Sequence, residues 1–103
     1  MKEHKKALMT ARKVLAYLEE AKKNDKIPLS YYHSVYPILK YNEAVELENL
    51  KEYEEALKCY ESAKKVENID GQLLERIDEG RRALKKILEK RMRRSSSQSR
   101  KEF

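Results

Sequence analysis

Three residues of this 103-residue chain belong to types that often act as nucleophiles, bases or metal ligands: His4, His33 and Cys59. No carboxylate pair, nucleophile or glycine-rich loop accompanies either histidine, so acid–base or nucleophilic catalysis is not expected. A single cysteine cannot form an internal disulfide, and without a Cys/His cluster it cannot complete a zinc site. Cys59 precedes Tyr60 inside a helical pattern, where a small structural side chain is expected. The sequence therefore predicts a protein that is not an enzyme and that uses neither a metal nor a cofactor.

A second group of residues could act through charge alone. Eight bases between residues 81 and 94 form a band dense enough to bind phosphates electrostatically: Arg81, Arg82, Lys85, Lys86, Lys90, Arg91, Arg93 and Arg94. Acidic residues are interspersed along the same predicted helix, and the nearest aromatic residue that could stack on a base is the distant Phe103. A solvated helix explains this band adequately, and nucleic acid is not expected as a partner.

The composition favours helices over sheets. Charged residues make up 41% of the chain, which has 2 Gly, 2 Pro and no Trp, whereas strands and their turns need more β-branched residues and glycine. The apolar fraction of 40% is too high for a wholly disordered chain. No apolar run approaches the roughly 20 residues that span a bilayer, and no apolar segment follows the basic N-terminus as in a signal peptide. A membrane partner is therefore not expected.

Apolar residues recur at helical spacing in four segments, over residues 3–23, 29–50, 53–66 and 71 to about 92. Their short connections make neighbouring helices antiparallel. Pro37 predicts a kink or a fresh start inside the second helix, and Asp70 is predicted to cap the fourth. The pattern stops at Ser95. We expect an all-α domain over residues 1–94, as a closed bundle or a stacked helical array, and a flexible, basic and Ser-rich linker over residues 95–103.

Charge is distributed unevenly along these segments. Residues 41–70 carry four bases and nine acids, whereas residues 1–23 carry seven bases and three acids, and residues 71–103 carry eleven bases and five acids. The acidic middle segment would attract basic helices packed on either side of it. The alternative is that these charges are solvated helix faces that serve only solubility.

Residues 51–63, with the sequence KEYEEALKCYESA, resemble the second half of a tetratricopeptide repeat, which is a helix pair of about 34 residues. The resemblance assigns packing roles to six residues: Ala44, Leu47, Tyr53, Ala56, Tyr60 and Ala63. It departs at Lys40 and Glu43, where the repeat has large apolar residues, and at Asn68, which replaces its closing proline. Since similar spacing arises in any amphipathic helix, a coincidental four-helix bundle stays an alternative.

The C-terminal part resembles one arrangement in particular, the last repeat, capping helix and linker of co-chaperones that join tetratricopeptide repeats to a J domain. The resemblance rests on residues 67–70, on the following helix and on residues 99–103, whose Arg-Lys-Glu-Phe run matches the opening of a J domain. It implies that the chain is a fragment without its J domain. The His-Pro-Asp tripeptide with which J domains stimulate heat-shock chaperones does not occur in these residues.

In a tetratricopeptide repeat, inner positions of the first helix line a groove, and these positions are here Ile38, Tyr41, Val45 and Glu48. Three of the four are apolar or aromatic, which suits an extended hydrophobic peptide better than a charged one. The alternative is that this face packs on the first helix as core. The nearby residues 31–36 hold three tyrosines, for which we expect half-buried packing between helices rather than an exposed aromatic patch.

The sequence thus predicts a non-catalytic protein–protein interaction module, the client-binding or docking segment of a J-domain co-chaperone. Its expected partners are unfolded or extended polypeptide and, through a J domain absent from this chain, a heat-shock chaperone. The resemblance allows the endoplasmic reticulum lumen or the cytoplasm. Two alternatives stay open: a three-helix peptide-binding domain like those that interact with microtubules and trafficking complexes, and a basic helical subunit that assembles on nucleic acid or in a larger complex.

Overall fold

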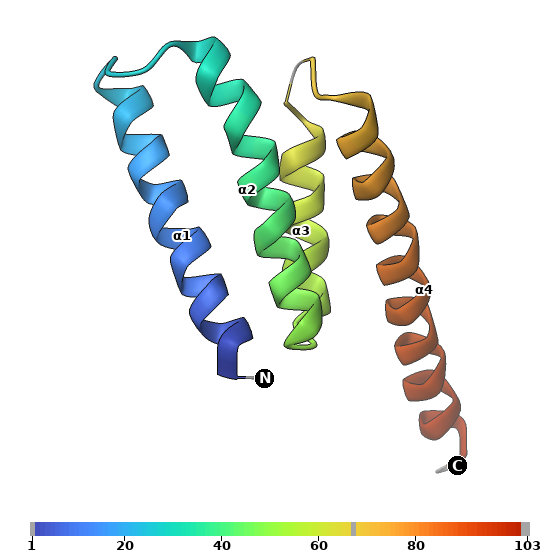
Figure 1. The fold of residues 1–103 in the computed structure, drawn as a ribbon. Helices are drawn as coiled ribbons and strands as arrows, with labels where there is room; N and C mark the ends of the chain where they lie inside the picture. The colour runs from blue at the N-terminus through green and yellow to red at the C-terminus, as the bar shows by residue number, and fades with distance from the viewer. Residues whose placement is uncertain (1, 67, 102–103) are drawn as a thin grey trace.

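The chain folds into four α-helices in a computed structural model, which describes residues 2–66 and 68–101 (Figure 1). The helices are α1 (Lys2–Lys23), α2 (Leu29–Asn49), α3 (Tyr53–Lys64) and α4 (Gly71–Lys101). The described residues contain no strand. The expectation of an all-α fold with four helices is confirmed.

The helices form an open array rather than a closed bundle (Figure 1). Helices α2 and α3 pack on each other in the middle, α1 packs on α2, and α4 packs on α3. Helices α1 and α4 therefore lie at opposite edges, each with one packed side and one open side, and both ends of the chain lie at the same end of the array. The radius of gyration is 16.6 Å, above the roughly 13 Å typical of a compact domain of this length.

The helices form where the apolar spacing predicts them. In α1 the buried residues are Leu8, Ala11, Leu15 and Leu18, which recur at steps of three and four and so lie on one side of the helix. Asp70 caps α4, since its carboxylate accepts the backbone N–H of Leu73 at 3.2 Å. Local sequence therefore accounts for both the packed side of α1 and the start of α4.

Each of the three connections turns through one residue in the left-handed region, namely Asp25 (φ 55°), Lys51 (φ 64°) and Asn68 (φ 58°). The first two turns also share a hydrogen bond that closes the preceding helix. The N–H of Lys26 donates to the carbonyl of Ala21 at 2.9 Å, and the N–H of Glu52 donates to that of Leu47 at 2.8 Å. This is the Schellman arrangement, which satisfies carbonyls left free at a helix end while the chain reverses.

Helix α2 does not restart at Pro37, and this part of the prediction is wrong. The helix runs unbroken from Leu29 to Asn49 with Pro37 inside it. The ring of Pro37 is among the most fully buried side chains, with under 2% exposed. Proline costs the helix one hydrogen bond, to the carbonyl of His33 four residues earlier. Burial of the ring offsets that loss, so the helix continues.

Helix α4 is longer than the sequence predicted. It was expected to end near residue 92, but its backbone continues to Lys101 through the Ser-rich segment. No glycine or proline follows Gly80, and serine costs a helix only a few tenths of a kcal/mol more than a good helix former. Residues 102–103 of the expected linker lie outside the described residues. Flexibility of residues 95–101 in solution stays a prediction, which amide hydrogen exchange tests.

Candidate functional site

The six residues to which the repeat resemblance assigns packing roles lie together. Five of them are at most 2% exposed: Ala44, Leu47, Ala56, Tyr60 and Ala63. The sixth, Tyr53, packs against them and is partly buried. The same cluster includes Leu8 of α1 and Ile77 and Leu84 of α4. The α2–α3 pair is thus the centre of a core to which both outer helices contribute.

Tyr60 links three helices within this core. Its hydroxyl donates to the carboxylate of Glu48 on α2 at 2.5 Å, and its ring centroid lies 5.8 Å from that of Tyr41. On the other side the ring lies directly against the backbone of Gly80 on α4. Burial and the bond to Glu48 raise the pKa of Tyr60 above its ordinary value, so the hydroxyl stays a donor. Tyr41 and Glu48, which were predicted to line a groove, therefore hold Tyr60 in place.

A groove of about 670 Å³ lies between the first half of α2 and the start of α4. Its apolar lining is Pro37, Ile38, Ile69 and Leu73, and its polar lining is Ser30, His33, Ser34, Asn68 and Asp70. Of the four residues predicted to line a groove, only Ile38 does so, and it is 49% exposed. Tyr41 and Val45 are half-buried. The groove is thus displaced along α2 from the predicted position, towards the N-terminus of the helix.

The sequence missed the α4 side of this groove. Ile69 and Leu73 reach it because the α3–α4 connection brings the start of α4 back beside α2. Leu73 belongs to the apolar stripe of the fourth segment, residues 71 to about 92. Nothing in the local pattern says which neighbour that stripe meets at its first turn, since the contact spans more than thirty residues of chain.

The tyrosines of α2 follow the expectation of packing in part. Tyr32 is buried, donates its hydroxyl to Glu19 of α1 at 2.5 Å, and stacks on the ring of Tyr36 at 5.2 Å. The ammonium of Lys22 lies 4.3 Å from the centroid of the Tyr32 ring. Tyr31, by contrast, is 52% exposed. This cluster fastens the C-terminal end of α1 to α2 and leaves one tyrosine at the surface.

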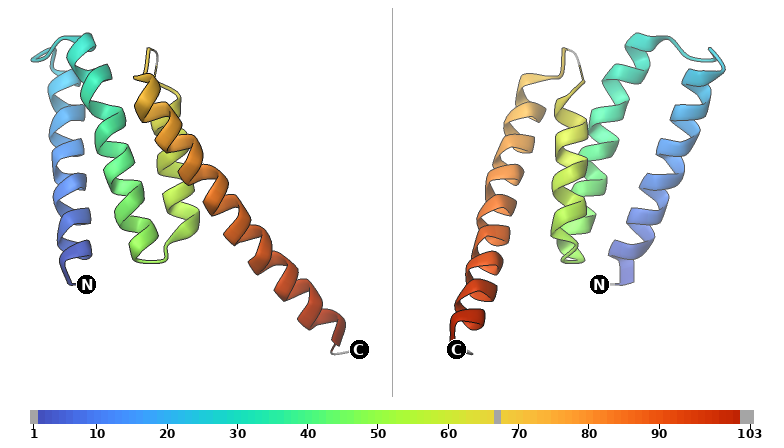
Figure 2. Two further views of the ribbon diagram at one scale, coloured as in Figure 1. Left: turned by 45° about the vertical axis from the view of Figure 1, so that its right-hand side comes forward. Right: turned by 180° about the vertical axis from the view of Figure 1, so that it is seen from behind.

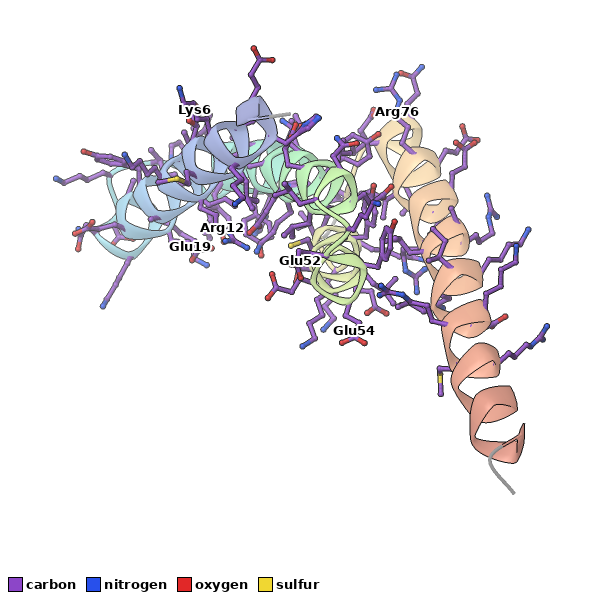
Figure 3. The ribbon with its side chains drawn as sticks, turned by 90° about the horizontal axis from the view of Figure 1, so that it is seen from below. Lys6, Arg12, Glu19, Glu52, Glu54 and Arg76 are labelled. Carbon is purple, nitrogen blue, oxygen red and sulfur yellow. The ribbon has the colours of Figure 1, made fainter. Side chains whose placement is uncertain are left out.

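The two polar residues that break the repeat pattern, Lys40 and Glu43, belong to an ionic cluster centred on the buried Glu43. Glu43 is 5% exposed and accepts from Nε of Arg12 on α1 at 2.9 Å and from Nζ of Lys40 at 3.1 Å. Arg12 also reaches Glu55 of α3 at 3.5 Å. Figure 3 shows Arg12 on the side of α1 towards α3, with Lys6 pointing away from it. This cluster ties α1 to the α2–α3 pair where the repeat would have apolar packing.

The ionic cluster changes the titration of its members. Burial by itself raises the pKa of Glu43, but the hydrogen bonds from Arg12 and Lys40 outweigh it and hold that pKa below its ordinary value. Burial, with the Glu43 carboxylate nearby, raises the pKa of the Cys59 thiol to about 12. A protonated, buried thiol is a poor nucleophile. Cys59 therefore has the properties of a packing residue.

Acidification should remove the stability that Glu43 contributes. Because its pKa in the folded protein lies below the ordinary value of 4.5, the contribution is complete above about pH 4.5 and is lost as the pH falls through the folded pKa. Glu43→Gln should therefore unfold at a lower temperature than the native protein at pH 7, and the gap should narrow as the pH falls below about 4.5. Thermal unfolding followed by circular dichroism measures this gap, with the exposed Glu54→Gln as control. A gap that stays constant with pH would contradict the assignment.

Further polar contacts join the outer helices to the α2–α3 pair. His4 is hydrogen-bonded through Nδ1 to Glu46 of α2 at 2.7 Å. On the other side of the array, Lys64 of α3 pairs with Asp78 of α4 at 2.9 Å, and Arg81 of α4 pairs with Glu61 of α3 at 3.6 Å. Arg81 with Glu61, and Arg12 of α1 with Glu43 and Glu55, join a base of an outer helix to acids of the middle segment, which is the polarity that the charge distribution predicted. The Lys64–Asp78 pair has the opposite polarity.

Two kinds of site are absent from the described part of the chain. Within residues 2–66 and 68–101, no group of three His, Cys, Asp or Glu side chains could hold a metal ion. No helix of the same residues is long and apolar enough to cross a membrane.

Comparison with protein families, with curated proteins and with solved structures finds no match to this chain. The resemblance to tetratricopeptide repeats and J-domain co-chaperones therefore stays a prediction. What the chain does must be inferred from its own residues and geometry.

Proposed function

We propose that this chain is a non-catalytic protein-interaction module that holds an extended, apolar stretch of polypeptide in the α2–α4 groove. The observation that carries the proposal is the groove itself. Its accessible apolar lining is Ile38, which is half exposed, with the partly buried Ile69 and Leu73. A concave apolar surface with a few polar groups at its rim is the usual form of a peptide-binding site.

The groove also has features that suit a peptide backbone. Pro37 has no N–H to give to the carbonyl of His33, and both residues line the groove. The hydroxyls of Ser30 and Ser34 lie along the same side. The Ser34 hydroxyl donates to the carbonyl of Ser30 at 2.9 Å and can still accept a bond from a ligand. An extended chain has unpaired N–H groups along its length, and such acceptors would bind them.

The open array supports the same role. In helical repeat proteins the units contact only their neighbours, and the extended surfaces that result bind other chains. On the resemblance of residues 51–63 and 99–103, we further propose that this module is the client-binding or docking segment of a J-domain co-chaperone. The client would then be an unfolded polypeptide, and a J domain outside these residues would engage the heat-shock chaperone.

Ile38→Gln should weaken binding of unfolded polypeptide about tenfold without unfolding the protein. Removing an apolar contact from a peptide interface of this kind costs about 1.4 kcal/mol, which corresponds to that factor. An exposed substitution should change the free energy of unfolding by at most about 0.5 kcal/mol. The probe is a labelled client protein that is kept unfolded by reduction and carboxymethylation of its cysteines. Its fluorescence anisotropy measures binding to the chain, and thermal unfolding of each variant measures stability.

Ile87→Gln is the matched control, since Ile87 is also exposed, at 37%, but lies on α4 outside the groove. It should leave affinity within about twofold of the native value. Equal losses for the two variants, or none for either, would show that the groove is not the binding site. A large fall in melting temperature for Ile38→Gln would show that this face is core.

A further inference from the structure

The C-terminal half of α4 presents a row of bases to solvent. Arg82, Lys86, Lys90 and Arg93 follow one another at steps of four, four and three, so they lie on one side of the helix. Lys85 lies beside them, and all five are exposed. Ile77 and Leu84, which pack on the core, lie on the opposite side. We call these five residues the basic face of α4.

The basic face lacks the ion pairs and the aromatic contact that other cations of the same helix make. Arg81 pairs with Asp78 at 3.3 Å and with Glu61 of α3, and Arg91 lies over the ring of Tyr53 at 5.4 Å. None of the ion pairs among the described side chains includes a residue of the basic face. Some of the acids interspersed along α4 therefore pair with residues outside the basic face and do not offset its charge. Asp78 pairs with Lys64 and Arg81, and from residue 81 to residue 93 only Glu89 is acidic.

We propose that the basic face of α4 binds the phosphate backbone of double-stranded nucleic acid. Five unpaired bases along about 18 Å of helix, at 1.5 Å per residue, provide a dense positive surface for a polyanion. Helix α4 lies at the edge of the array and leans away from α3 towards its C-terminal end (Figure 2). An edge helix with an open outer side can approach a duplex, whose major groove admits an α-helix.

The chemistry of the face distinguishes a duplex from other anionic partners. The exposed apolar residues of this half of α4, Ile87 and Met92, lie about 140° apart around the helix, so they do not form the apolar side that membrane-surface helices need. The face has no aromatic residue on which single-stranded bases could stack. It also lacks the aromatic or apolar anchors that dominate protein interfaces. What remains is charge alone, which suffices for duplex phosphates and carries no sequence specificity.

This surface is separate from the groove of the proposed function. The groove ends at Leu73, whereas the basic face begins at Arg82, about 13 Å further along the helix. Binding at one site therefore leaves the other accessible, and the two proposals can fail independently.

The test compares two variants that lose the same charge at different places. Lys85→Gln/Lys86→Gln/Lys90→Gln changes the basic face, and Lys5→Gln/Lys6→Gln/Lys13→Gln removes three exposed lysines from α1 at the opposite edge of the array. Anisotropy of labelled 20-base-pair DNA and RNA duplexes of mixed sequence measures affinity between about 50 and 200 mM salt. Unlabelled poly-glutamate and vesicles with anionic lipid serve as competing polyanions.

We expect the native chain to bind a duplex with strong salt dependence. The α4 variant should bind at least about tenfold more weakly in 50 mM salt. The slope of its log affinity against log salt concentration should be smaller in magnitude by up to about 2.7, or about 0.9 for each phosphate that the variant no longer neutralises. The α1 variant should bind within about threefold of the native affinity.

Binding to both duplexes indicates that the shared phosphate backbone is the ligand, and binding to one alone identifies which nucleic acid it is. Equal losses for the two variants, no duplex binding at 50 mM salt, or stronger binding to poly-glutamate or vesicles than to either duplex would overturn the proposal.

Discussion

Gly80→Ala should destabilise the protein by about 1–3 kcal/mol, although alanine is the better helix former by about 1 kcal/mol. A Cβ at position 80 would lie 2.6 Å from Cζ, 2.8 Å from Cε2 and 2.9 Å from the hydroxyl oxygen of Tyr60. These separations are below any van der Waals contact, so the Tyr60 ring or helix α4 must move. The ring is 2% exposed and its hydroxyl is bonded to Glu48, so it has no free space to enter.

Urea unfolding of two further variants separates the clash from helix propensity. Gly71→Ala is the matched control, because no atom lies within 4 Å of a Cβ at that position. It should be neutral or slightly stabilising. In a Tyr60→Leu background the shorter side chain should remove the clash, so adding Gly80→Ala should then stabilise the protein by up to about 1 kcal/mol. The same loss in both backgrounds would show that contact with Tyr60 is not the cause.

Ala56→Leu should be comparably damaging, with an expected loss of about 1–3 kcal/mol. Ala56 is 0% exposed and lies in the core cluster with Ala44 and Ala63, both also fully buried. Small side chains at these positions let α2 and α3 approach closely, and a leucine must push the two helices apart. The m-value in urea should stay unchanged if the variant keeps two-state unfolding, while the midpoint falls.

Ala16→Leu provides the comparison for Ala56→Leu, since Ala16 is exposed on α1. The same change in side-chain volume should there alter the free energy of unfolding by no more than about 0.5 kcal/mol. If Ala56→Leu were equally harmless, α2 and α3 would not pack as closely as the structure shows. The proposal of a repeat-like helix pair would then lose its structural basis.

Lys40 and Glu43 show what sequence comparison alone does not reveal. Against a tetratricopeptide repeat both residues are mismatches, because the repeat places large apolar side chains there. In the structure they form an ionic cluster around the buried Glu43, whose third member, Arg12, lies 31 residues before Glu43. A charged residue at a core position is stable only with such partners. No pattern within the second helix could reveal an ionic partner that α1 provides.

The candidate groove was predicted in part for the same reason. Spacing correctly placed residues 38, 41 and 45 on one side of a helix, because that depends only on helix geometry. Which of them stays accessible depends on the neighbouring helices. Tyr41 lies against Tyr60, whereas Ile38 faces the space beside Leu73. Local spacing therefore predicted the side of α2, and the packing of α3 and α4 selected the part of it that forms the groove.

The sequence by itself determined the four helices, most of their ends and the capping role of Asp70. These features depend on interactions within a few residues, namely apolar periodicity, cap hydrogen bonds and turn residues, so a short window of sequence contains their cause. The unbroken course of α2 through Pro37 was not predicted, since burial of its ring in the folded protein offsets the lost bond. The open array, the close contact of Tyr60 with Gly80 and the unpaired basic face of α4 were decided only by tertiary structure. Each of these depends on whether side chains that are far apart in the chain come into contact, and the packing of the whole fold decides that.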